Sequence, residues 1–566
     1  MSTVSSTTSS TTTSASTGYS ALKASDSGTG LDYSALIEAA VASRLTRADR
    51  IDSKITANQA KISAYSTMQT LLQAVNTSID GLRNRTVSTG AQSNLFSQRT
   101  AYLAGGGSMS ASDVLAASVA EGTATGAYSV EVKQLATRNK IGSAKQSSQT
   151  DALGLSGTVT LGVEGGLGVS IDIAADASLK DISDAINAQK ATSGVSAGIV
   201  KVSDTQYQLV LTATDTGKAI TLADSSGSVL SGLGVTDGSG NVANTLVAAQ
   251  DAILDIDGVT VTRSSNTISD AISGVTLDLY SADVGNPISV EVSTDLSSIK
   301  SALTTFVSAY NSFRDFATQQ QATTTDGTKS DGATLFADSL LRQVNQSIYN
   351  VLNGKVATSG GALSLSDLGI TFDSGNTLTL DETTLNSALT NRLDDVRTLL
   401  GLNMTSSSSD LQLLRYNNSL TKTSFTLDVQ VGSDGTLTGA SVDGDASMFD
   451  VKDTRVIGKD GTPYAGLVFV YTGKSGSIDV NFSEGLADTL YTAIDGAVNS
   501  TSGDIKKLTD QLKSTDDDLQ TRSDTIKSNA EDYRSRLTQY YARLEQKAEQ
   551  ANALLKQLTY TDSSSS

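Results

Sequence analysis

The chain of 566 residues carries 41 Lys and Arg against 60 Asp and Glu, which gives a formal net charge of −19. A protein this acidic repels a phosphate backbone, so nucleic acid is not an expected partner. There is no Cys, His or Trp, which excludes a Ser/His/Asp triad, a cysteine nucleophile, a histidine-ligated zinc site and disulfides. The length predicts several domains, and 48 glycines beside 5% aromatic residues favour small β-rich modules over one dense enzyme core.

Residues 1–27 are rich in Ser and Thr and lack the apolar core of a secretory signal peptide. We expect this segment to be disordered. No later stretch has the run of about 18 apolar residues that a membrane helix needs, so membrane insertion is not expected. Any export of the protein would therefore use another route.

A first long helix is predicted within residues 28–94. From Gly30 to about Gly81 apolar residues recur in steps of three and four, and Asn58 occupies one polar position of the stripe. Such a helix spans roughly 75 Å, which exceeds one compact domain. The stripe comprises Ile37, Val41, Leu45, Ala48, Ile51, Ile55, Ile62, Tyr65, Met68, Leu72, Val75, Ile79 and Leu82.

Two segments, 95–148 and 246–294, show the alternating pattern of half-buried strands, as in GAYSVEVKQLAT at 126–137. Between them, residues 149–245 carry a self-contained pattern of strands and a helix, with Ser178 as its expected N-cap. We therefore predict a discontinuous β-rich head domain, with an outer α/β head domain inserted between its two halves.

The second half of the chain returns to helices. Residues 295–423 are predicted to form a helical and mixed domain at the base of a stalk, with helices at 295–316 and 334–352. Residues 424–482, which are full of Gly and Asp turns, predict a β-rich insertion. Residues 483–560 are again almost continuously helical, and we expect the Ser-rich tail 561–566 to be disordered.

The last helix has a seam of its own in steps of three and four. We predict it to run through Ile505, Leu508, Leu512, Thr515, Leu519, Arg522, Ile526, Ala530, Tyr533, Leu537, Tyr540, Leu544, Ala548, Ala551, Leu555 and Leu558. Two consecutive steps of four at 522, 526 and 530, and again at 540, 544 and 548, predict stutters, which favour straight helices. From Asp504 to Tyr560 the helix is roughly 85 Å long, close to the length of the N-terminal helix. The predicted fold is α+β and multidomain: long antiparallel terminal helices form a coiled-coil-like stalk, and discontinuous β-rich head domains are inserted between them.

Signals for chemistry are weak. The segments 326–332 and 441–450 place carboxylates near glycines, but neither has the ligand order of a calcium loop, so we favour turns over a metal site. Paired acids such as Asp394 and Asp395 lie in polar helical contexts that are typical of a solvated face. We expect no catalytic residues, no metal site and no cofactor, and hence no enzyme.

The end of the last helix presents an apolar stripe in ANALLKQLTY at 551–560. The chain's other end at this level is the Ser/Thr-rich segment, and an uncovered apolar stripe is typical of a partner surface. For the middle parts of the helices, a core within one subunit is the alternative. The predicted partner-binding residues are Ile37, Val41, Leu45, Leu537, Leu544, Leu554, Leu555 and Leu558.

Several stretches carry a family resemblance. They include GTGLDYSALIEAAVASRL at 28–45, GAYSVEVKQLATRNKIGS at 126–143, LDIDGVTVTRSSNTISDAISGVTLDL at 254–279 and LSDLGITFDSGNTLTLDETTLNSAL at 365–389. In this order they resemble the flagellar filament-capping family, also called hook-associated protein 2 or FliD. The resemblance implies a structural cap at the distal tip of the bacterial flagellar filament, which retains exported flagellin and promotes its folding and insertion into the growing filament.

The resemblance also implies partners and a location. The partners would be further copies of the chain in a homo-oligomeric ring, flagellin, hook-filament junction proteins, and a chaperone of the flagellar type III apparatus that exports the protein to the cell exterior. Two other readings remain open at this point. One is a secreted or cell-surface adhesin, and the other is a subunit of the filament or of the hook junction.

Overall fold

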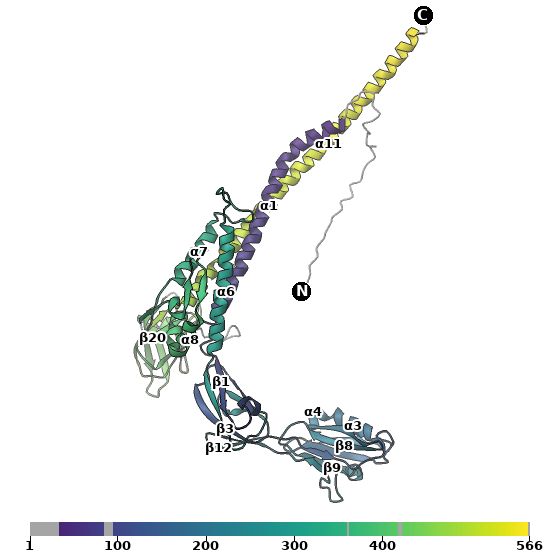
Figure 1. The fold of residues 1–566 in the computed structure, drawn as a ribbon, viewed down its shortest axis with the longest axis vertical. Coiled ribbons are helices and arrows are strands. Elements are labelled where there is room, and N and C mark those ends of the chain that lie inside the picture. Colours follow the sequence, from purple (N-terminus) through teal and green to yellow (C-terminus); the bar gives the residue numbers. More distant parts are fainter. Residues whose placement is uncertain (1–32, 84–93, 359–360, 417–421, 564–566) are drawn as a thin grey trace.

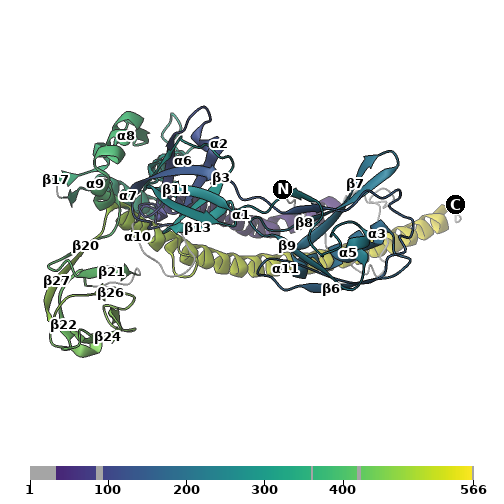
Figure 2. The ribbon, with the colours of Figure 1, turned by 90° about the horizontal axis from the view of Figure 1, so that it is seen from below.

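The computed structural model describes residues 33–83, 94–358, 361–416 and 422–563. Two long helices, α1 (Tyr33–Asp80) and α11 (Asp504–Ser563), lie side by side in antiparallel directions and form a stalk (Figure 1, Figure 2). Each helix has one apolar stripe, and the two stripes are buried when they face each other. The predicted tail 1–27 lies outside the described residues, whereas α11 continues past the expected end at Tyr560 to Ser563.

The stalk widens at one end into a mainly helical base domain. Its elements are α6 (Leu296–Gln320), α7 (Ser339–Leu352), η1 (Leu365–Leu368), α8 (Glu382–Asn391), α9 (Leu393–Leu400), α10 (Leu486–Val498) and the hairpins β16 (Val356–Thr358) with β17 (Gly361–Leu363) and β18 (Ile370–Phe372) with β19 (Leu378–Leu380). The helices predicted at 295–316 and 334–352 are α6 and α7. The second begins later than predicted, at Ser339, because the Asp338 side chain caps it by accepting a hydrogen bond from the Leu341 amide.

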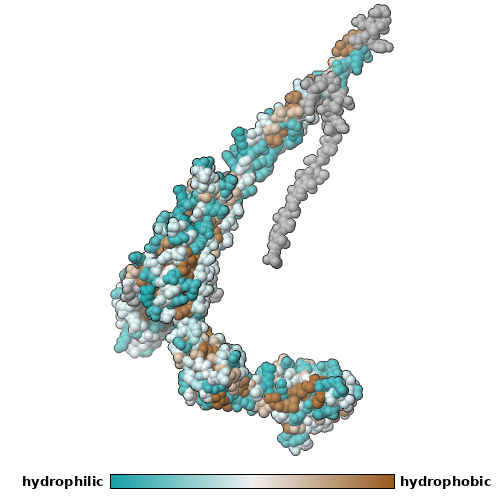
Figure 3. Space-filling view, viewed as in Figure 1, coloured by the Kyte–Doolittle hydropathy of each residue, from teal (hydrophilic) through white to brown (hydrophobic). Residues whose placement is uncertain are grey.

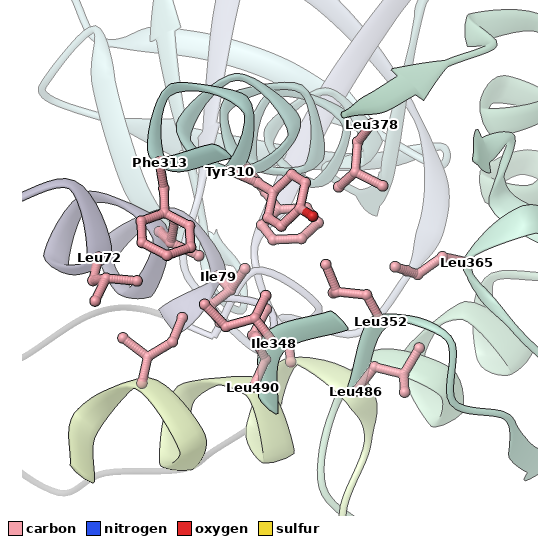
Figure 4. Packing of buried hydrophobic residues seen from close by; sticks show 14 of the residues in the cluster. Leu72, Ile79, Tyr310, Phe313, Ile348, Leu352, Leu365, Leu378, Leu486 and Leu490 are labelled. Carbon is pink, nitrogen blue, oxygen red and sulfur yellow. The ribbon is translucent and has the colours of Figure 1, made fainter. Parts of the chain in front are cut away.

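One apolar core joins the base to the stalk. Figure 4 shows Leu72 and Ile79 of α1 facing Ile348 of α7 and Leu490 of α10, with Tyr310 and Phe313 of α6 above them. These side chains are almost fully buried. The C-terminal half of α1 is therefore a core element of the base, and only its N-terminal half depends on α11 alone.

The head domain next to the base is built from strands on both sides of an insertion. Its larger sheet has the order β1-β15-β3-β11-β12, and its smaller sheet the order β13-β14-β2. The elements are β1 (Arg99–Gly105), α2 (Ala111–Val114), β2 (Leu115–Val119), β3 (Gly126–Gln134), β11 (Ala252–Ile256), β12 (Val259–Arg263), β13 (Thr267–Ile272), β14 (Val275–Leu279) and β15 (Ile288–Thr294). Alternating side chains such as Val130, Val132 and Val290 fill the core between the sheets.

The inserted outer domain packs two antiparallel sheets and short helices around a core of its own. The sheets have the orders β10-β4-β8-β7 and β6-β5-β9. The predicted N-cap Ser178 is confirmed, because its hydroxyl accepts from the Asp181 amide in a capping box. The elements are β4 (Lys140–Gly142), β5 (Gly157–Val163), β6 (Val169–Ile173), α3 (Leu179–Ala188), α4 (Lys190–Ser193), β7 (Val195–Ser203), β8 (Gln206–Ala213), β9 (Ile220–Gly227), α5 (Val229–Gly232) and β10 (Thr245–Val247).

A third β unit, a sandwich of two four-stranded sheets, lies beside the base. Its sheets have the orders β20-β27-β22-β23 and β21-β26-β25-β24. It begins before the predicted start at 424, because β20 and β21 are edge strands that pair with β27 and β26, late in the unit. The elements are β20 (Asn403–Ser406), β21 (Leu411–Arg415), β22 (Ser424–Val431), β23 (Leu437–Val442), η2 (Ala446–Met448), β24 (Phe449–Lys452), β25 (Arg455–Gly458), β26 (Val468–Tyr471) and β27 (Gly476–Ser483).

The predicted fold class is confirmed: the terminal helices pair antiparallel, and β-rich domains are inserted between them. In Figure 1 the head domains extend from the base, at the opposite end of the stalk from the C-terminal end of α11. The stalk therefore presents a tip that is remote from the heads.

Candidate interaction surface on the stalk

The seam that α11 turns toward α1 differs from the predicted one at several positions. Thr515, Arg522, Tyr540 and Leu544 were expected in the seam, but all four side chains are exposed. Ile505 and Ala530 of the predicted seam are buried, and Asp516 and Ser523 are buried in place of their neighbours Thr515 and Arg522. The predicted stutter through 522, 526 and 530 is therefore wrong, because the seam passes through Ser523 and steps by three to Ile526.

Polar side chains in this seam bond across the two helices. The Asn58 Nδ2 of α1 donates to the Asp516 Oδ1 of α11 at 2.7 Å. Two turns farther along α11, Ser523 Oγ donates to Asp52 Oδ1 at 2.6 Å, and Lys527 Nζ lies 2.8 Å from Asp52 Oδ2. These donors, first Lys527 and then Ser523, hold the pKa of Asp52 below its usual range. The seam is thus partly polar, and its polar residues on α11 are Asp516 and Ser523 rather than the predicted Thr515 and Arg522.

Nearer the tip, a small apolar cluster closes the helix pair. It is formed by Ile37, Val41 and Ala530, with Leu45, Tyr533, Leu537 and Tyr541 packed against it. Arg44 stacks over the Tyr533 ring at 3.8 Å, and Arg534 pairs with Glu38 at 2.7 Å. Four predicted partner-binding residues therefore lie together in this cluster, where the same chain covers them: Ile37, Val41, Leu45 and Leu537. Their role toward a partner stays a prediction.

The other four predicted residues lie farther along α11. The ring of Tyr33, the first residue of α1, stacks on Tyr541 at 4.9 Å, and α11 continues beyond this contact. The apolar seam continues with it in steps of three and four, and Figure 3 shows hydrophobic residues near this end of the rod. The exposed fractions are 41% for Leu544, 63% for Leu554, 58% for Leu555 and 62% for Leu558.

A buried ionic cluster that sequence reasoning missed lies where α1 meets α10. Arg83 Nε donates to Asp488 Oδ1 and Arg83 Nη1 to Asp80 Oδ1, both at 2.9 Å. The guanidinium also lies 3.5 Å from the centroid of the Tyr491 ring. The carbonyl of Arg83 accepts from the Leu402 amide, just before the β sandwich begins. This arginine thus anchors the junction of stalk, base and sandwich.

Within the described ranges the chain shows no group of three or more acidic residues placed to hold a metal ion. In the same part of the chain no helix is long and apolar enough to cross a membrane.

Comparison with known proteins decides the family. The model of the flagellar hook-associated protein 2 C-terminus matches residues 249–553, and that of the N-terminus matches residues 29–139. The chain belongs to the flagellar hook-associated protein 2 family. A flagellin hook IN motif also matches residues 156–215, in the outer head domain.

Individual relatives agree with the family models. The chain is 30% identical over 377 residues to flagellar hook-associated protein 2 of Escherichia coli K12, which covers 64% of this chain and 76% of the relative. It is 28% identical over 403 residues to the A-type flagellar hook-associated protein 2 of Pseudomonas aeruginosa, with 66% and 78% covered. A crystal structure of the D1-D2-D3 domains of the flagellar cap protein FliD from Escherichia coli covers 80% of this chain and 99% of its own, at 24% identity and a TM-score of 0.48.

Family membership confirms the function predicted from the sequence at this level, a structural cap of the flagellar filament. The adhesin alternative gains no support. Within the hook-associated protein 2 fold, the tip of α11 is the surface where the predicted partner contacts and the observed exposure coincide.

Proposed function

We propose that this protein sits at the distal tip of the filament as a ring of identical subunits, retains exported flagellin there and promotes its insertion. The observation that carries the proposal is the continuation of the apolar seam of α11 beyond the stacked pair of Tyr33 and Tyr541. Leu544 and Leu554 expose large apolar surface on an otherwise polar helix. A helix of this kind fits a hydrophobic groove or pairs with another amphipathic helix.

The composition of the tip suits a contact that forms and breaks repeatedly. Its leucines alternate with small residues such as Ala548 and Ala551, and the flanks carry both charges, as in Arg543 and Glu549. Tight protein interfaces usually centre on Trp, Tyr or Arg anchors in deep pockets, whereas the exposed apolar residues here are mainly leucines and alanines. A cap must hold the filament end and yet move each time a subunit is added, so several weak contacts serve it better than one strong contact.

The proposal extends to export and to the remaining partners. The protein would leave the cell through the flagellar type III apparatus, and a chaperone would cover the tip of α11 beforehand. Hook-filament junction proteins would receive the cap before the first flagellin arrives. With no Cys and only two Pro, refolding after export meets no disulfide step and few slow proline isomerisations. No catalytic step is part of the proposal.

The tip is tested by changing Leu554, Leu555 and Leu558 together to Asp in the full-length protein. We expect shorter filaments, weaker swimming and more monomeric flagellin in the medium. The matched control places Asp at Gln546, Gln550 and Asn552, which are exposed polar positions on the same helix. The control should leave filament length unchanged. Normal filaments in the leucine variant would show that the tip is not the partner surface.

Deletion of the gene tests the cap function separately from the tip. We expect filaments to be absent or short and flagellin to be lost to the medium as monomer. Normal filaments after deletion would refute the cap. If the deletion shortens the filaments but the leucine variant does not, the flagellin contact lies elsewhere on the molecule.

A further inference from the structure

The two head domains are joined by a narrow neck, which Figure 1 shows between β12 and β8. The chain crosses the neck twice, in residues 135–139 and again in residues 248–251. The crossings lie antiparallel, and the Thr137 amide and hydroxyl donate to the carbonyls of Gln250 and Ala248, both at 2.8 Å. Each head domain has an apolar core of its own. Domains joined in this way usually move relative to each other, so a fixed neck would need contacts that hold it.

An asparagine fastens the neck to the inner head domain, the one next to the base. Asn266 Oδ1 accepts from the Ala136 amide at 2.7 Å, and Asn266 Nδ2 donates to the Ala136 carbonyl at 2.9 Å. The main-chain carbonyl of Asn266 accepts from the Leu279 amide of β14, so the asparagine is itself held by a sheet of the inner domain. Because a side-chain amide carries both a donor and an acceptor, Asn266 fixes the direction in which the chain leaves this domain.

A second asparagine fastens the neck to the outer head domain. Asn139 is 6% exposed, its Oδ1 accepts from the Ile220 amide at 2.9 Å, and its Nδ2 donates to the Val247 carbonyl at 2.8 Å. These partners lie at the start of β9 and the end of β10. In the first crossing, only residues 137–138 lie between the two asparagine contacts and could serve as a hinge.

A loop of the outer domain packs against this remaining site. Residues 214–219 connect β8 to β9, and within them the Gly217 amide donates to the Thr137 carbonyl at 3.0 Å. The neighbouring Thr216 hydroxyl donates to the Ser264 carbonyl at 2.6 Å, and Ser264 lies in the turn between β12 and β13 of the inner domain. The loop 214–219 therefore contacts the neck and the inner head domain at once.

At Gly217 the two domains approach without room for a side chain. A Cβ at this residue would lie 2.5 Å from Asp251 Oδ1 and 2.6 Å from the Ser264 Cα, closer than Cβ atoms come to other heavy atoms. The φ angle of 71° is also one that glycine adopts readily and other residues rarely do. A larger residue would have to push the loop 214–219 away from Ser264, which is main chain and cannot swing aside.

We propose that the loop 214–219 locks the neck, so that the two head domains move as one rigid arm. The contacts of Thr216 with Ser264 and of Gly217 with Thr137 close the site at which the neck could bend. A displacement of the outer head domain is then passed to the inner one and on toward the base, instead of being absorbed in a hinge. The lock acts whatever the heads bind, so it does not rest on the proposed cap function.

The chain contains no cysteine, so two introduced cysteines carry spin labels without interference. Ser289→Cys places one label on β15 of the inner domain and Ala188→Cys places the other on α3 of the outer domain, both at exposed positions. Double electron–electron resonance on the full-length protein, diluted with unlabelled chains, gives the distribution of the distance between them. We expect one narrow distribution. A broad or multiple distribution would overturn the proposal.

Gly217→Val in the labelled protein should release the lock. The valine side chain forces the loop 214–219 off Ser264, so the distance distribution should widen by about twofold or more. Gly198→Val is the matched control, because it makes the same change on β7 of the same domain, where a Cβ meets nothing within 4 Å. This control should leave the width of the distribution unchanged.

Circular dichroism establishes that each variant is folded. If Gly217→Val does not fold, Thr216→Val with Asn266→Ala serves as the second test, since it removes the hydrogen bonds to Ser264 and Ala136 without adding bulk at the neck. A width that stays unchanged in a folded lock variant, or that increases equally in the Gly198→Val control, would overturn the proposal.

Discussion

Asp52 and Ser523, which lie 471 positions apart in the chain, share a hydrogen bond of 2.6 Å between Oδ1 and Oγ. The contact joins the first helix to the last, and Lys527 adds an ion pair to the same carboxylate. Ser523 is fully buried, whereas the Asp52 side chain is 38% exposed, so solvent screens the ion pair in part. The stalk is therefore held at this level by polar contacts with a defined geometry rather than by apolar burial alone.

Acid should weaken the stalk through this carboxylate. The pKa of Asp52 is lowered in the folded protein, so its contribution to stability is present above the pKa of the unfolded chain and is lost as the pH falls through the folded pKa. We expect Asp52→Ala to lower the melting temperature of the stalk at neutral pH, with a difference from wild type that narrows in acid. Melting followed by circular dichroism at neutral and acidic pH measures this; a constant difference would contradict it.

Arg83→Met should be among the most destabilising single changes. Arg83 is 3% and Asp488 0% exposed, and the change leaves a buried carboxylate without its guanidinium. Breaking a buried ion pair from one side typically costs about 3–5 kcal/mol of unfolding free energy. Urea unfolding of the full chain provides the measurement. Arg397→Met, at a partly exposed position, serves as a control and should cost little, since the ion pair of Arg397 with Asp394 lies at the surface.

Buried and exposed leucines of the stalk should differ sharply in their effect on the free energy of unfolding. Leu72 is fully buried in the core of the base, and Leu72→Ala should cost about 2–5 kcal/mol of unfolding free energy. Leu554 is 63% exposed, and Leu554→Ala should change that free energy by less than about 0.5 kcal/mol. Denaturation of both variants tests the contrast. A large loss at Leu554 would show that the tip packs within its own subunit.

Two glycines of α10 should change the stability of the base in opposite directions when each is replaced by alanine. A Cβ at Gly485, the N-cap of α10, would lie 2.3 Å from the Leu400 carbonyl carbon, so Gly485→Ala should destabilise the base by at least about 1 kcal/mol. A Cβ at Gly496, inside α10, meets nothing within 4 Å, so Gly496→Ala should stabilise it by roughly 0.5–1 kcal/mol. Thermal melting of the two variants compares them directly.

Tyr464 offers a test inside the β sandwich. Its ring packs 4.8 Å from Phe425 and 5.0 Å from Phe449, and the buried hydroxyl finds no hydrogen-bond partner among the described residues. Since a buried hydroxyl without a partner costs about 1–3 kcal/mol, Tyr464→Phe should leave the stability unchanged or raise it. Tyr310→Phe is the matched comparison and should lower stability, because the Tyr310 hydroxyl donates to the Asn376 carbonyl. Calorimetry of both variants decides between the outcomes.

The periodicity of single segments was sufficient to predict many of the helices of the fold. The helix from Tyr33 to Asp80, the helices α6, α7 and α11, and the Ser178 cap follow from spacing and local hydrogen bonding, which neighbouring residues in the chain determine. The sandwich was placed too late in the chain because β20 and β21 are short edge strands. Their partners β27 and β26 lie more than 50 residues away. The spacing of apolar residues within a strand does not reveal which distant strand it pairs with.

By itself the sequence determined the family, the two long helices and the apolar end of the second one, because these depend on residue types and their spacing. Only the tertiary structure decided which residues face each other across the stalk. Asp516 and Ser523 read as solvated positions on an isolated helix, and they are buried because Asn58 and Asp52 bring hydrogen-bonding partners from the other end of the chain. The burial of a polar group is a property of two segments at once, and a single amphipathic pattern does not contain it.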